Sequence, residues 1–145
     1  MSVPFRFDTV LRIRETERDV CLQSFAAEQS REVALRAERD LIAGERLRAL
    51  DELRTLQEGT SWSAEQAVAH QQHLEHLALR LIETEAALSE ATTQVTLRRQ
   101  ELLEADFAVK ALDKLAERHH VDQSRLTQAK EERERDDTRR SGRAA

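Results

Sequence analysis

A heptad pattern of apolar residues runs without interruption from Ala67 to His119 and limits what this chain can fold into. Steps of alternately three and four residues give two interleaved rows. One row is apolar throughout: Ala67, Leu74, Leu81, Leu88, Val95, Leu102, Val109 and Ala116. The other is mixed and mostly small: His70, Leu77, Thr84, Ala91, Arg98, Ala105, Leu112 and His119. This pattern predicts the seam of a left-handed coiled coil. Because so narrow a stripe cannot form a globular core, it also predicts a second helix packed against the first.

The composition favours long helices over a compact domain or a disordered chain. Charged residues make up 35% of the 145 residues and aromatic residues 3%, with only three Gly and one Pro. Few helix breakers among so many charged residues are typical of a coiled coil, and the regular seam argues against disorder. The net charge of −5 argues against nucleic-acid binding, which needs a basic face.

The sequence also favours a cytoplasmic location. Cys21 is the only cysteine, so no internal disulfide can form, and a reducing compartment is favoured. No apolar run reaches the roughly 20 residues of a membrane span, and the N-terminus lacks the apolar part of a signal peptide. The narrow stripe and its interspersed charges favour burial against a helix over binding to a membrane surface. We expect no membrane insertion.

A first helix is predicted from about residue 5 to residue 58. Pro4 suits a helix start, and Gly44 costs about 1 kcal/mol relative to alanine without ending the helix. Toward the end of this stretch the residues at seven-residue intervals are apolar: Leu35, Ile42, Ala49 and Leu56. Upstream, a different register is followed by Leu22, Ala26 and Val33, and four charged residues fall inside the seam: Glu28, Glu32, Arg39 and Arg46. The first helix is therefore the more weakly specified partner.

The helical pattern breaks in the sequence Glu-Gly-Thr-Ser-Trp-Ser. Gly59 can adopt the left-handed conformation that ends a helix. Ser63 followed by Gln66 fits a capping box at a new helix start. These signals predict a turn over about residues 59–63 between two antiparallel helices. Trp62 either closes this turn over the last apolar layer or is an exposed anchor for a partner.

The second helix is predicted from about residue 64 to residue 137, followed by a frayed tail over residues 138–145. At about 1.5 Å per residue it exceeds about 100 Å, against about 80 Å for the first helix. The predicted fold is therefore all-α: an antiparallel two-helix coiled-coil hairpin with a longer second helix, forming one domain over residues 1–145.

The difference in helix length predicts an overhang. Folding the chain back about Thr60 places the Phe5–Leu11 region beside residues 109–115. Everything after about Ala116 is then a single, highly charged helix without a partner in its own chain.

Motifs that carry enzyme chemistry are missing from the sequence. It has no glycine-rich phosphate loop, no nucleophile elbow and no paired cysteines, and a hairpin offers no concave scaffold. His70, His73 and His76 are the strongest metal candidates, with His119 and His120 further on. A zinc site needs three or four ligands in a fixed geometry, so we interpret the first three as a solvated polar turn beside the seam. We expect no enzyme activity, no cofactor and no bound metal.

Arg98 is a cation inside the predicted seam of the second helix. It either sets the helix register by discouraging other pairings or extends its charged group out of a layer of small residues. Both interpretations are compatible with the sequence.

Short motifs near the ends of the two helices carry a resemblance to a known family. The chain opens with F-x-F-x-x-V-L-x-x-R, formed by Phe5, Phe7, Val10, Leu11 and Arg14. The stretch 109–119, V-K-A-L-D-K-L-A-E-R-H, is similar to a K-x-L-E-K-L-x-E-R element, with Asp113 in place of glutamate. With the acidic pair Asp136–Asp137 and the hairpin pattern, these motifs resemble the FliJ family, small cytoplasmic components of the flagellar type III export apparatus.

The resemblance implies a stalk similar to the central shaft of rotary ATPases, with its terminal half inserted into the ring of the export ATPase. The residues that would contact the ring are Phe5, Phe7, Leu11, Lys110, Leu112, Lys114, Leu115 and Arg118. The predicted overhang agrees with this role, because a ring could cover a helix that has no partner in its own chain.

The resemblance also implies a contact between the middle of the hairpin and the cytosolic domain of the export gate. The Q-Q-x-L-x-x-L stretch over residues 71–77 is similar to the family's contact region on the second helix. It selects His73, Leu77, Arg80 and Thr84. Leu77 is also a seam residue, so packing is its other interpretation.

The function implied is that of a non-enzymatic protein that couples the export ATPase ring to the export gate and escorts export chaperones. Such a protein would be peripheral at the cytoplasmic side of the cell membrane. Two alternatives stay open: the equivalent stalk of a virulence type III secretion system, and a structural coiled coil that self-associates through its overhang.

Overall fold

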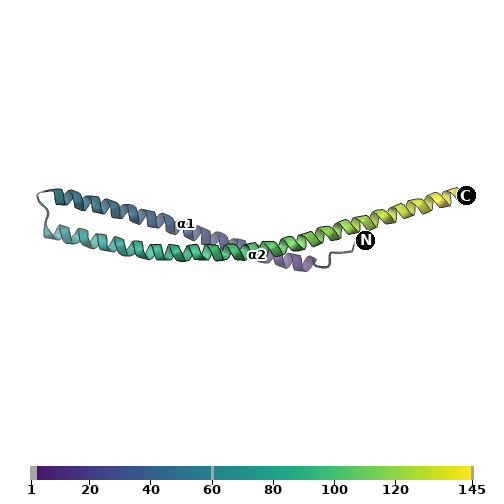
Figure 1. Cartoon of the computed structure of the whole chain (residues 1–145), viewed down its shortest axis with the longest axis horizontal. Coiled ribbons are helices and arrows are strands. Elements are labelled where there is room, and N and C mark those ends of the chain that lie inside the picture. The colour runs from purple at the N-terminus through teal and green to yellow at the C-terminus, as the bar shows by residue number, and fades with distance from the viewer. Residues whose placement is uncertain (1–2, 60, 145) are drawn as a thin grey trace. The chain divides into compact units, whose positions relative to one another are not determined.

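Two long helices make up the part of the chain that the computed structural model describes, residues 3–59 and 61–144 (Figure 1). Helix α1 spans Asp8–Glu58, with 51 residues, and helix α2 spans Ala64–Ala144, with 81 residues. Within these described residues there is no strand. The predicted all-α class, with a longer second helix, is confirmed.

The contacts within the chain divide it into two units. The hairpin unit, Leu22–Gln100, contains the later part of α1, the loop and the first part of α2. The terminal unit combines Met1–Cys21 with Glu101–Ala145, and so contains the start of α1 and the rest of α2. The sequence predicted a single unit because the heptad pattern of α2 continues through this boundary.

The core of the hairpin unit forms where the apolar rows of α1 and α2 meet. Ile42 and Leu77 each keep only 1% of their surface exposed, and Ala49 keeps 2%. Leu74 and Leu81 pack against these three residues. Further along the same unit the buried residues of α2 are Thr84, Leu88, Ala91 and Val95. Burying a large aliphatic side chain stabilises a fold by about 1.5–3 kcal/mol, so this row holds the two helices together.

In the terminal unit the same two rows of α2 continue to face α1. Val109 is 1% exposed, and the other seam residues are half-buried: Leu102, Ala105, Leu112, Ala116 and His119. Every position of the two rows from Ala67 to His119 is buried or half-buried. The seam predicted for the second helix is therefore confirmed.

Helix α1 does not change register upstream, which corrects the prediction for Leu22, Ala26 and Val33. Leu22 is 51% exposed and Val33 61% exposed. In the hairpin unit, the row of Leu35, Ile42 and Ala49 extends toward the N-terminus of α1 in the same register. The half-buried residues that extend it are Glu32, Glu28 and Phe25. Because the seam of α2 is continuous, α1 must present the same stripe along its length, even where that stripe carries charge.

The glutamates of this seam keep partners on their own helix. The Glu32 side chain is only 13% exposed, and its Oε1 lies 2.7 Å from Nη2 of Arg36. Glu28 Oε2 lies 3.7 Å from Nη1 of Arg31, but this oxygen accepts no hydrogen bond. Arg98 is half-buried, and its Nε is also buried without a hydrogen bond, although the residue has another interaction partner. Such buried charges stabilise a seam less than apolar residues of similar size would.

The turn between the helices contains the predicted capping box. The Ser63 backbone N–H donates to Gln66 Oε1 at 3.1 Å, and the Gln66 N–H donates to Ser63 Oγ at 3.2 Å. The left-handed conformation predicted for Gly59 is wrong, because no described residue has a positive φ. Instead, the Gly59 N–H donates to the carbonyl oxygen of Leu56 at 3.3 Å, and this tight last turn ends α1. Trp62 is 39% exposed.

The pairing of α1 with α2 in the terminal unit is shifted from the prediction. The ring centroid of Phe5 lies 5.7 Å from that of His119, whereas residues 109–115 were the predicted neighbours of Phe5–Leu11. Arg18 Nη1 lies 4.0 Å from Asp106 Oδ1, which agrees with the same shift. The prediction assumed a pivot at Thr60, which lies outside the described residues, and this was too early because the non-helical segment continues to Ser63.

Both ends of the helical region also differ from the prediction. Helix α1 begins at Asp8 rather than near residue 5, and the preceding residues Val3 and Phe5 contact His119 of α2. Helix α2 continues to Ala144, the last described residue, where a frayed tail over residues 138–145 was predicted. The hydroxyl of Thr138 donates to the carbonyl oxygen of Glu134 at 2.7 Å, so the polar residues of this stretch do not interrupt the helix. All residues from Ser124 to Ala144 are exposed, and the overhang therefore begins later than Ala116.

We expect Ser63→Ala to lower the free energy of unfolding by about 1 kcal/mol, because it removes the side-chain acceptor of the Gln66 N–H. Urea unfolding followed by circular dichroism would measure the loss. Ser61→Ala, in the same loop and also exposed, is the matched control and should leave the midpoint unchanged. Equal losses in the two variants would contradict a specific role for the cap.

We expect Leu77→Ala and Leu79→Ala to differ strongly, although the two leucines are close in the sequence. Leu77 is 1% exposed and Leu79 is 61% exposed. Truncation of a buried leucine costs about 2–5 kcal/mol, whereas exposed substitutions usually stay within about 0.5 kcal/mol. Parallel thermal and urea unfolding would measure both. A loss in Leu79→Ala as large as that in Leu77→Ala would place the seam on the wrong face of α2.

Candidate interaction surfaces

Aromatic residues gather at the non-helical start of the chain, in the terminal unit. The half-buried ring of Phe5 lies 5.9 Å from that of Phe7, edge to face, and 5.7 Å from that of His119. His119 Nε2 lies 2.8 Å from the carbonyl oxygen of Val3. Phe5 therefore anchors this segment to α2, whereas Phe7, at 39% exposure, still offers surface to a partner. That His119 contacts Val3 and Phe5 was not predicted from the sequence.

The other residues predicted to contact an ATPase ring divide between the seam and the surface. Leu11 and Leu112 are half-buried in the terminal unit. The remaining four are exposed: Lys110, Lys114, Leu115 and Arg118. Lys110 Nζ lies 2.8 Å from Asp106 Oδ2. The exposed members of the predicted set are thus mostly cationic, and Asp113 and Glu117 lie beside them on α2.

Phe107 is a surface residue that the sequence interpretation missed. It is 76% exposed, more than any other large apolar residue described. It lines an open groove of about 420 Å³ along α2, together with Lys110, Ala111, Asp113, Lys114 and Glu117. A signal was present in the sequence, because Phe107 lies outside both seam rows in a chain with 3% aromatic residues.

The residues predicted to contact the export gate do not form one surface. His73 is exposed and Arg80 half-buried, but Leu77 and Thr84 keep only 1% and 7% of their surface exposed. Leu77 belongs to the core with Ile42 and Ala49. Leu77 and Thr84 therefore pack between the helices, and a partner can reach only the other two.

Other apolar residues of α2 do face outward at this level of the hairpin unit. Val68, Leu79 and Ile82 are 52%, 61% and 63% exposed. On α1, Leu41 and Leu47 are 64% and 67% exposed. The sequence could have identified them as large apolar residues outside the seam, a position that packing within the chain does not require.

No cluster of metal ligands forms among the residues that the structure describes. No group of three or more His, Cys, Asp or Glu side chains is placed to hold a metal ion within residues 3–59 and 61–144. His70 lines a shallow groove with Thr55 and Leu56, whereas His73 lines a different one with Glu45 and Arg48. His70 and His73 therefore do not share a groove.

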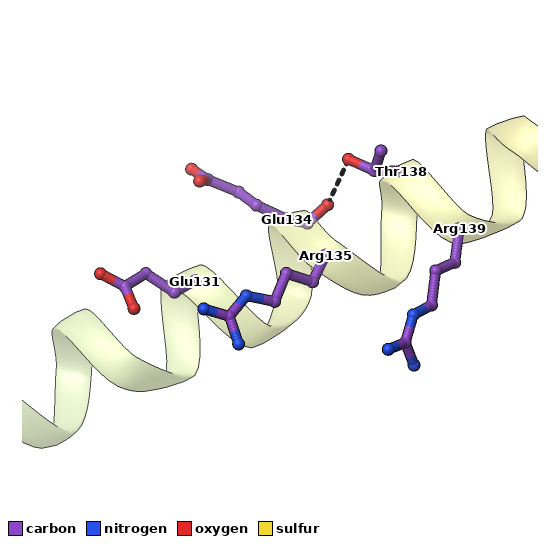
Figure 2. Close-up of a pocket in the computed structure, with 5 residues that line it drawn as sticks. All are labelled: Glu131, Glu134, Arg135, Thr138 and Arg139. Atoms are coloured by element: carbon purple, nitrogen blue, oxygen red, sulfur yellow. Dashed lines mark hydrogen bonds between the residues drawn. The ribbon is translucent and has the colours of Figure 1, made fainter.

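The exposed end of α2 holds a further groove on a single helix (Figure 2). Its lining is entirely from consecutive turns of α2: Glu131, Glu134, Arg135, Thr138 and Arg139. The only bond drawn among them is that from the Thr138 hydroxyl to the Glu134 carbonyl oxygen, and the Glu134 and Arg139 side chains point away from each other (Figure 2). This is the surface of a charged helix, with no enclosed space for a small molecule.

Neither helix has, in the residues that the structure describes, a stretch with the length and hydrophobicity of a membrane span.

Comparison with known proteins identifies the family. The model of the flagellar FliJ protein family matches residues 2–144. No curated protein and no solved structure gives a significant match. The match covers essentially the whole sequence, and the two packed helices agree with the fold that the end motifs implied. The chain therefore belongs to the flagellar FliJ protein family.

Proposed function

We propose that this chain is a stalk that couples the ring of the export ATPase to the cytosolic domain of the export gate and escorts export chaperones. Membership of the FliJ family already places it among non-enzymatic components related to flagellar type III export. The coupling, the escort and the peripheral location at the membrane are the proposal. The observation that carries it is that each of the two units presents its own exposed surface for a partner.

The terminal unit supports the contact with the ATPase ring. Its surface combines Phe7 with the cations Lys114 and Arg118, and α2 stays exposed from Ser124 to Ala144. Most helical stability in proteins comes from packing of an apolar face, and this exposed polar stretch has no such packing. A surrounding ring would stabilise this stretch by covering it.

The hairpin unit supports the contact with the export gate. Leu79 and Ile82 stand out from α2, and His73 lies exposed about two turns before them. Exposed apolar residues with polar neighbours are typical of protein–protein contacts. We therefore assign the gate contact to His73, Leu79, Arg80 and Ile82, and leave Leu77 and Thr84 to the core.

The alternative of self-association through the overhang has little support. Over the exposed stretch Ser124–Ala144, Leu126 is the only large apolar residue, at 65% exposure. A coiled-coil seam needs apolar residues that repeat over several heptads. A stalk of a virulence type III system would share the fold, but the family match favours the flagellar system.

Truncation after Leu112 tests the ATPase contact. The hairpin unit keeps the core of Ile42, Ala49 and Leu77, so the shortened chain should stay helical. We expect it to lose stimulation of ATP hydrolysis by the export ATPase, because the exposed cations beyond Leu112 and the overhang are gone. The measurement is the rate of ATP hydrolysis by the export ATPase with the full-length and the truncated chain. Circular dichroism checks that the truncated chain is folded. Full stimulation by the folded truncated form would show that the proposed role of this end is wrong.

The double variant Leu79→Ala with Ile82→Ala tests the gate contact. Both side chains are more than 60% exposed, so stability should change little. We expect the affinity for the purified cytosolic domain of the gate to fall about tenfold or more, since truncated hot-spot residues commonly cost that much. Calorimetric titration would measure it. Leu47→Ala, 67% exposed on α1, is the control, and unchanged binding by the double variant would refute the assignment.

A further inference from the structure

The first described residues, Val3–Phe7, form a short non-helical segment that contacts α2 within the terminal unit, and we call this segment the strap. Pro4 keeps the strap out of α1, because the residue before a proline avoids the helical conformation and proline has no N–H to donate. Helix α1 has its own start. The Leu11 N–H donates to the carbonyl oxygen of Phe7 at 2.8 Å, and Asp8 lies in the first turn, where a carboxylate is favourable. The strap can therefore leave α2 while α1 stays folded.

One residue of α2, His119, makes the contacts that hold the strap. Its Nε2 lies 2.8 Å from the carbonyl oxygen of Val3, and its ring centroid lies 5.7 Å from that of Phe5. A carbonyl oxygen can only accept a hydrogen bond, so Nε2 carries the hydrogen and donates. His119 is half-buried at a seam position, whereas the adjacent His120 is exposed. The strap thus depends on a single side chain of α2.

The attachment of the strap is small, and most of the segment lies in water. Val3 is 61% exposed and Phe7 39% exposed. Pro4 and Arg6 are also exposed, and Phe5 alone among the five strap residues is half-buried. A hydrogen bond between neutral groups changes an equilibrium by only about two- to tenfold, because both groups bind water when they are apart. Terminal segments with so few buried contacts open at low free energy. A partner that binds the released strap can therefore displace it.

Opening the strap would expose a pair of aromatic rings. In the closed position the ring of Phe5 lies edge to face with that of Phe7, at 5.9 Å, and beside His119. The guanidinium carbon of Arg6 lies 5.5 Å from the centre of the Phe7 ring. Aromatic residues and arginine are the residue types enriched where proteins anchor one another. Phe5 is the member of this group that the closed strap covers.

We propose that the strap masks a binding surface of its own chain: His119 holds it closed, Phe5 is covered there, and a partner binds the aromatic pair only when the strap is open. This inference rests on the proposed function, in that the partner is the export ATPase ring. It adds a regulatory step to that contact. When only the open form binds, the observed affinity is reduced by the fraction of chains that are open. A change at His119 that opens the strap should therefore strengthen binding.

The first measurement is trypsin cleavage after Arg6 in the full-length chain, followed by mass spectrometry. The protease cuts the open form, so its rate follows the open population. His119→Ala removes the donor and the ring, and alanine already occupies two other positions of the same seam, Ala105 and Ala116. We expect cleavage about threefold faster or more. His119→Gln restores an N–H donor and should reduce this increase, and His120→Ala is the matched control and should behave as the unaltered chain.

The second measurement is the affinity of the same chains for the purified export ATPase, by calorimetry. We expect His119→Ala to bind more tightly than the unaltered chain, by the same factor by which its cleavage is faster. Adding Phe5→Ala to His119→Ala should abolish the gain, because the uncovered ring is then missing. Circular dichroism of each variant checks that the helices are intact.

The possible results separate this inference from the proposed function. Unchanged cleavage after Arg6 in His119→Ala would show that this residue does not hold the strap, and the inference would be wrong. Faster cleavage with unchanged or weaker ATPase binding would show that the strap masks no contact. That result overturns the inference, although the stalk function stands if the unaltered chain binds. If neither the unaltered chain nor His119→Ala binds the ATPase, both proposals are wrong.

Discussion

The structure depends on one narrow interface, the seam along which α1 and α2 bury their apolar rows. A two-helix fold has no other interior, so a few residues provide most of its hydrophobic stabilisation, above all Ile42, Leu77 and Val109, each 1% exposed. Residues outside the seam remain largely on the surface, and α2 is longer than α1 can cover. The grooves described on the two helices are open and shallow, so the features available for chemistry are those of the helix surfaces.

The seam carries one arginine in α2, Arg98, and several charged residues in α1, and this asymmetry has consequences. Glu28 and Glu32 occupy positions where leucine would stabilise more, and each is paired with an arginine of its own helix. These glutamates face the seam because the row of α2 is continuous, although a carboxylate is more stable in water. Within the hairpin unit, Glu28 and Arg98 both place charge in the seam away from the core. Pairing there should be weaker than around Ile42 and Leu77.

Much of the fold could be predicted because its signals are local or periodic. The rows from Ala67 to His119 and the capping box of Ser63 with Gln66 need only spacing and hydrogen-bonding capacity. The register of α1 could not be predicted from α1 alone, because Leu22 and Val33 suggest a stripe that the partner helix does not match. The pairing of Phe5 with His119 depends on where the turn pivots, and a small shift of that pivot changes every pair.

The candidate surfaces were harder to predict, because a family motif selects positions without saying which side of a helix they occupy. It selected Leu77 and Thr84, which pack inside, and passed over Leu79, Ile82 and Phe107, which do not. In the sequence, a candidate surface residue is recognised as a large apolar residue that lies outside the two seam rows. Packing within the chain gives no reason for such a residue, and exposure to water disfavours it. In a two-helix protein, then, large apolar residues that depart from the heptad pattern are the candidates to test for partner contacts.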